Sequence, residues 1–125
     1  MNIEIRILAS GDEGMLGHVA AGVFDHDVDP DLTAEFLRDP RHHLAVALEG
    51  TLVVGFASAV DYVHPDKPRE LWINEVGVAP SHQRQGIGRR LLAAFGASSF
   101  VRDSADSGWP FDLVPAGDRG IAQCT

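Results

Sequence analysis

The residues with the clearest chemical potential form one short run at 83–90, Gln-Arg-Gln-Gly-Ile-Gly-Arg-Arg. Glycines at a turn let the backbone approach a ligand closely, and successive N–H groups at a helix start form a cradle for anions. Arg84, Arg89 and Arg90 add positive charge suited to phosphate. A pyrophosphate would fit, although the run is neither a P-loop nor a Rossmann turn. The alternative is a helix start with a solvated, arginine-rich face.

A strand and a helix must position this run. Residues 70–79 are mainly apolar and predict a strand, in which Gly77 is a candidate bulge and after which Pro80 ends the strand. Residues 88–97 predict a helix, because Leu91, Leu92 and Phe95 recur on one side. The run is therefore expected to be a turn between the two.

The preceding residues predict further elements from their periodicity and their turn residues. Asp29 followed by Pro30 predicts the start of a helix, and Glu49 with Gly50 predicts a hairpin turn. The predicted elements are a strand at 3–8, helices at 12–24 and from 30 to about 39, strands at 43–48 and 51–63, and a loop at 64–68. The order is β-α-α-β-β-β-α, which makes residues 1–97 one core domain.

Composition and charge narrow the classes of protein further. The 125 residues are 45% hydrophobic and 22% charged, which is typical of one globular domain, and no apolar run reaches the roughly 20 residues of a membrane helix. The single cysteine, Cys124, and the absence of a secretory signal predict a cytoplasmic protein. The net charge is -8, and residues 1–50 hold ten acidic residues against three arginines. This excess disfavours nucleic acid and favours a cationic partner, unless it is simply a solvated surface.

The stretch 74–92 resembles motif A of the GNAT superfamily of N-acyltransferases. That motif is a Gln/Arg-x-x-Gly-x-Gly/Ala turn after the fourth strand, and the order of elements before it is also similar to the family's. The resemblance covers residues 3–97. It implies an α+β fold with a mixed, mostly antiparallel sheet flanked by helices, and acetyl-CoA as the acetyl donor.

The resemblance also implies where acetyl-CoA binds. The backbone of the fourth strand would pair with the pantetheine arm at Val76 and Val78, and Gly77 would part this strand from the next. The amides of the following turn would bind the pyrophosphate. The turn residues concerned are Gln83, Arg84, Gln85, Gly86, Ile87 and Gly88, with Arg89 beside them.

The implied chemistry is attack of an amine on a thioester. Because most amines are protonated near neutral pH, a base must accept a proton, usually through water. Glu75 is the candidate base, since the resemblance places it beside the acetyl group; its alternative role is an ion pair or a solvent-facing residue. The backbone amide of Val78 is the candidate donor to the developing oxyanion.

A closer resemblance is to the gentamicin (aminoglycoside 3-N) acetyltransferase subgroup, on the stretches 24–27, 62–65 and 75–78. It gives the acidic N-terminal half a role, because aminoglycosides are polycations that carboxylates attract. Asp25, Asp27 and Glu75 are accordingly the candidate substrate-binding residues.

Residues 98–125 depart from the family pattern. A complete member continues through a fifth strand, a fourth helix and two more strands, whereas this atypical tail predicts at most one short strand, at 111–114. We expect either a truncation or a shifted reading frame, and the sequence leaves both open. An unclosed sheet exposes an edge strand, which predicts a homodimer.

Two functions follow. The first is an acetyl-CoA-dependent N-acetyltransferase acting on a primary amine of a cationic small molecule, with an aminoglycoside as a candidate. The alternative is a catalytically weak acyl-CoA-binding module, a truncated relative without an acceptor site. Neither involves a nucleic acid, a membrane or a metal.

Overall fold

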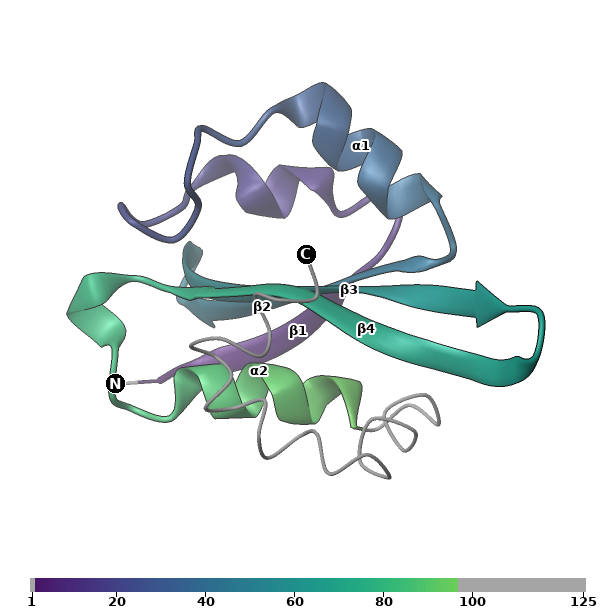
Figure 1. Ribbon diagram of the computed structural model, residues 1–125. Helices are drawn as coiled ribbons and strands as arrows, with labels where there is room; N and C mark the ends of the chain where they lie inside the picture. Colours follow the sequence, from purple (N-terminus) through teal and green to yellow (C-terminus); the bar gives the residue numbers. More distant parts are fainter. Residues whose placement is uncertain (1, 97–125) are drawn as a thin grey trace.

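A computed structural model describes residues 2–96, and its main feature is one antiparallel sheet (Figure 1). The expected α+β fold is confirmed, while the tail at 98–125, with the predicted strand at 111–114 and Cys124, lies outside the described residues. The strands follow the chain in the order β1-β2-β3-β4. Their bounds are Glu4–Leu8 for β1, His42–Glu49 for β2, Leu52–His64 for β3 and Lys67–Val78 for β4.

Helices cover both faces of this sheet. The short 3-10 helix η1 (Glu13–Gly17) and α1 (Pro30–Arg38) lie on one face, and α2 (Ile87–Phe95) lies on the other (Figure 1). β2 and β3 are buried on both faces, so their sequences are nearly continuous apolar runs. The alanines of β2 and β3 face α2, and their small side chains let the helix pack closely through Ile87, Leu91 and Phe95.

The start of α1 confirms the sequence prediction. The Asp29 side chain accepts hydrogen bonds from the backbone N–H groups of Asp31 at 2.8 Å and of Leu32 at 3.1 Å. Pro30 occupies the first helical position, where its missing N–H costs nothing. This cap fixes the end of the connector at 25–29, which borders the pocket described below.

The predicted helix at 12–24 is wrong. Only η1 is helical, and the chain then runs beside β3, where Val19 forms a parallel bridge with Val53. The N–H of Ala20 donates to the carbonyl of Val53 at 2.9 Å, and the N–H of Val53 donates to the carbonyl of His18 at 2.9 Å. Glycines explain the difference, because each one inside a helix costs about 1 kcal/mol relative to alanine. They stand at positions 14, 17 and 22.

The bulge predicted at Gly77 is also wrong. Gly77 pairs regularly with Phe56, whereas the register shifts between the pairs Ser58–Glu75 and Ala59–Ile73, which leaves Asn74 as the extra residue. Gly77 is needed for another reason. A Cβ there would collide with the backbone carbonyl oxygen of Val23 and would lie 2.8 Å from the ring of Phe56.

The loop expected at 64–68 is shorter than predicted. His64 pairs with Lys67, so only Pro65 and Asp66 lie between β3 and β4. Pro68 is tolerated inside β4 because this strand is an edge of the described sheet, where a missing N–H need not break a ladder.

Candidate active site

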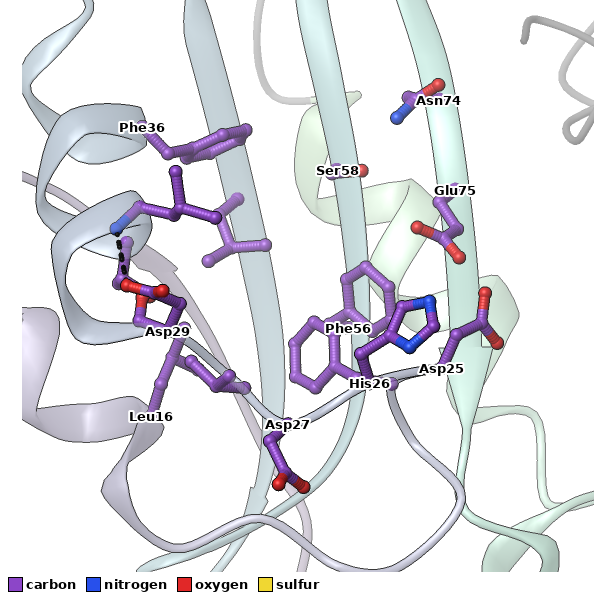
Figure 2. Close-up of a pocket in the computed structure, with 15 residues that line it drawn as sticks. Leu16, Asp25, His26, Asp27, Asp29, Phe36, Phe56, Ser58, Asn74 and Glu75 are labelled. Carbon is purple, nitrogen blue, oxygen red and sulfur yellow. Dashed lines mark hydrogen bonds between the residues drawn. The ribbon is translucent and has the colours of Figure 1, made fainter.

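A pocket of about 360 Å³ lies between α1, the connector and the sheet (Figure 2). Its floor is apolar and includes Phe24 and Phe56, whose rings stack with centroids 4.1 Å apart. Its rim is polar and acidic. The polar lining residues are Asp25, His26, Asp27, Asp29, Thr33, Ser58, Asn74 and Glu75.

The structure brings the three predicted substrate-binding carboxylates to this one pocket. Asp25 and Asp27 come from the connector, and Glu75 comes from β4. Figure 2 shows the carboxyl groups of Asp25 and Glu75 near each other, with Asp27 farther along the connector. Partial burial raises the pKa of Glu75, and the charge and hydrogen bonding of Asp25 raise it further.

This pair should make Glu75→Gln stabilising at neutral pH. A carboxyl whose pKa is higher in the folded than in the unfolded state destabilises the fold once it ionises. Removing its charge therefore stabilises the fold at a pH above the folded-state pKa, and has no effect at a pH below the unfolded-state pKa. We expect the melting temperature to rise by about 1–3 °C at pH 7.5, the range of weak surface charge pairs, and to stay unchanged near pH 3.5. Thermal unfolding at both pH values tests this, and a loss of stability at pH 7.5 would contradict the carboxylate pair.

The sequence did not single out Ser58 and Asn74, which complete the polar side of the pocket. Ser58 could have been found, because it interrupts an otherwise apolar face of β3. Asn74 reaches the rim only because of the bulge, which a period-2 pattern does not reveal.

Within residues 2–96, β4 is an edge strand that pairs only with β3. The N–H of Ala79 donates to the carbonyl of Val54 at 2.8 Å, and Gly55 pairs with Val78. Antiparallel pairs alternate between hydrogen-bonded and non-bonded, so the N–H groups of Val76 and Val78 point away from β3. The Val78 carbonyl accepts a hydrogen bond from the Gln83 side chain at 3.1 Å. The Val76 and Val78 N–H groups therefore lie along the edge of the described sheet.

The turn at 83–88 follows the short helix η2 (Pro80–His82). Arg84 has φ 66°, and Gly86, the N-cap of α2, has φ 79° and no side-chain cap. In the described part of the chain, the Gly86 cap thus leaves the N–H groups at the start of α2 without a capping side chain, which suits an anion. Ile87 is buried in the core, so only its backbone can face a ligand.

The arginines of the run have two different surroundings. Arg84 and Arg89 are exposed, and neither has an ion-pair partner among residues 2–96. Arg90, expected to add charge for phosphate, instead donates to the carbonyl of Ile3 at 2.8 Å and ties α2 to the chain before β1.

Among residues 2–96, no three histidine, cysteine or acidic side chains come together as metal ligands. No helix within that range is long and apolar enough to span a membrane.

Comparison with known proteins identifies relatives of both the sequence and the fold. The model of the acetyltransferase (GNAT) family matches residues 12–95. N-alpha-acetyltransferase RimI of Mycobacterium tuberculosis is 33% identical over 93 residues, which are 72% of this chain. The chain spans 58% of the length of that relative.

Solved structures of low sequence identity share the fold. An aminoglycoside acetyltransferase from an uncultured soil metagenomic sample, in complex with sisomicin, aligns with a TM-score of 0.64 at 20% identity, over 86% of this chain and 72% of that one. The structure of AAC(6')-Iy in complex with a bisubstrate analogue, CoA-S-monomethyl-acetylneamine, aligns with a TM-score of 0.60 at 20% identity, over 87% and 76% of the two chains.

Proposed function

The chain belongs to the GNAT acetyltransferase family, and on this premise we propose that it transfers an acetyl group from acetyl-CoA to a primary amine of a cationic acceptor. One observation carries the proposal: a single strand, β4, presents Glu75 to an acidic pocket and the Val78 amide to an open edge. An acceptor in the pocket and a donor on the edge can thus meet at one short stretch of β4, residues 75–78.

The residues present fit acetyl-CoA. The N–H groups of Val76 and Val78 point away from β3 and can pair with the amide groups of pantetheine, while the Val78 carbonyl is hydrogen-bonded to the Gln83 side chain. At the turn, a Cβ added to Gly86 would meet nothing within 4 Å, so the backbone there is open to a pyrophosphate. The exposed Arg84 and Arg89 complement its charge. A similar fold, that of AAC(6')-Iy, was solved with a CoA-containing bisubstrate analogue.

The proposed chemistry assigns one task to each group. Glu75, through a water molecule, accepts the proton that the amine must lose before its nitrogen attacks the thioester carbon. The N–H of Val78 donates a hydrogen bond to the carbonyl oxygen as negative charge develops there. The C–N bond forms, the C–S bond breaks, and the sulfur leaves as the CoA thiol or thiolate.

We propose an aminoglycoside as the acceptor, because Asp25, Asp27 and Glu75 offer three carboxylates to a polycation in one pocket. The resemblance to the 3-N subgroup supports this choice, as its stretch 24–27 and Glu75 of its stretch 75–78 line the pocket. The relatives themselves differ: one is named an N-alpha-acetyltransferase and others are aminoglycoside acetyltransferases. The proposal places the enzyme in the cytoplasm, as a homodimer.

A thiol-release assay with acetyl-CoA tests this function. The acceptors are a panel of aminoglycosides, polyamines and short peptides with free N-termini, and calorimetry with CoA is run in parallel. We expect turnover at least tenfold faster with the preferred aminoglycosides than with peptides. Faster turnover of peptides would reassign the acceptor. CoA binding without turnover of any amine would support the acyl-CoA-binding module instead, and no CoA binding would overturn both functions.

A further inference from the structure

The side chain of His82 makes two hydrogen bonds, one of which joins the helix η2 to the end of β2. The Nε2 atom of His82 lies 2.8 Å from Oε1 of Glu49, and its Nδ1 atom lies 2.8 Å from Oγ of Ser81. The imidazole is only 12% exposed, whereas the Glu49 side chain is 38% exposed. One neutral tautomer satisfies both contacts: Nε2–H donates to Glu49, and Nδ1 accepts from the Ser81 hydroxyl.

The contact between His82 and Glu49 joins residues that are 33 positions apart in the sequence. Glu49 ends β2 beside the hairpin turn, and His82 is the last residue of η2, immediately before the turn at 83–88. The N–H of His82 also donates to the carbonyl of Ala79 at 2.8 Å. The residue is therefore held by its backbone and by both ring nitrogens.

The turn that follows has little packing of its own. Gln83, Arg84, Gln85 and Gly86 are all exposed, and a Cβ on Gly86 would have no neighbour within 4 Å. Arg84 adopts φ 66°, a conformation that costs free energy for a residue with a side chain. An exposed segment in a costly conformation keeps its shape only if its ends are fixed. Ile87, buried in the core, fixes the C-terminal end.

We propose that His82, held by Glu49 and Ser81, is the positioning residue that fixes the N-terminal end and so aligns the turn's N–H groups for the CoA pyrophosphate. This inference rests on the proposed function. It assigns His82 no contact with either substrate. Its effect should fall on the pyrophosphate and not on the pantetheine arm, which the β4 edge would bind independently.

The test measures binding of two probes to the full chain, CoA by calorimetry and pantetheine, which lacks the pyrophosphate, by ligand-detected NMR. We expect His82→Ala to raise the Kd of CoA about five- to tenfold, as for the loss of a fixing hydrogen bond, and to change the Kd of pantetheine less than twofold. Equal weakening of both probes, or no weakening of CoA, would overturn the inference.

Variants of the partner make the test independent of how well His82→Ala folds. Glu49→Ala should weaken CoA binding as much as His82→Ala, and the double variant no more than either one, because the two act as a unit. Glu49→Gln keeps an acceptor oxygen and should bind CoA as the wild type does. His64→Ala is the matched control, since that histidine pairs with Asp66 at the other end of β3.

The outcomes separate the two claims. Additive effects of the Glu49 and His82 variants, or wild-type CoA binding by Glu49→Ala, would overturn the positioning role alone. Failure of the wild-type chain to bind CoA would overturn the proposed function, and the positioning role with it.

Discussion

Glu75→Gln is expected to lower kcat at least about 100-fold while the Kd of CoA stays within twofold of the wild type. The amide keeps the size of the carboxyl group but cannot accept the proton, and a positioned base contributes about 10² to 10⁴ in rate. The thiol-release assay at saturating acetyl-CoA and acceptor measures kcat, and calorimetry measures CoA binding. A decrease of less than about threefold would mean that another group is the base.

The pH dependence of kcat/KM is a second test of Glu75 as the base. A base must be ionised, so a raised pKa of Glu75 moves the acid limb of kcat/KM above the ordinary glutamate value of 4.5. Asp25→Asn removes the charge that contributes to the increase, and should move this limb to lower pH. The limb should remain above 4.5, because burial is the largest cause and persists.

Asp27→Asn is the matched control for this shift. Asp27 lines the same pocket but is not among the causes that raise the pKa of Glu75. Its replacement should raise the KM of a polycationic acceptor and leave the acid limb where it is. A shift of equal size in both variants would contradict the specific coupling of Asp25 to Glu75.

Gly77→Ala is expected to be the most destabilising single methyl in the described part of the chain. The new Cβ would collide with the Val23 carbonyl, which is backbone and cannot rotate away, and would press on the ring of Phe56. Overpacking of this kind costs about 1–3 kcal/mol, and the upper end corresponds to a melting temperature roughly 12–20 °C lower. Chemical and thermal unfolding measure the loss.

Gly88→Ala is the control for Gly77→Ala. It makes the same chemical change eleven residues later, but its Cβ would meet only side-chain atoms of Val76 and Val78 at 3.8 Å or more. Gly88 lies inside α2, where alanine is favoured over glycine by about 0.5–1 kcal/mol. This variant should be as stable as the wild type or more stable. A stable Gly77→Ala variant would show that the segment before Val23 can move aside.

Local signals in the sequence correctly predicted where the two α-helices begin. Asp29 with Pro30 marks the start of α1, and the turn at 83–88 marks the start of α2. The helix predicted at 12–24 was wrong, because the apolar spacing of this segment fits a helix while its glycines favour pairing with β3. That choice depends on a partner more than 30 residues away. Local pattern does not contain it.

The candidate site was predicted in part for similar reasons. Asp25, Asp27 and Glu75 followed from a family resemblance and from charge, and the fold brings all three to one pocket. The position of the bulge at Asn74 depends on the register of β3 against β4, and the contact of His82 with Glu49 depends on the placement of η2 beside the end of β2. Both are tertiary features without a signature in sequence spacing.

Side chains and backbone amides of β4 point in different directions, and this has a kinetic consequence. The Glu75 side chain points into the pocket on the α1 face, whereas the backbone amides of Val76 and Val78 point along the plane of the sheet to its edge. In the proposed function, a donor along the edge and an acceptor from the helix face reach the same strand by separate routes. The proposal therefore predicts a ternary complex, in which the acetyl group passes directly between the two substrates without a covalent acetyl-enzyme intermediate.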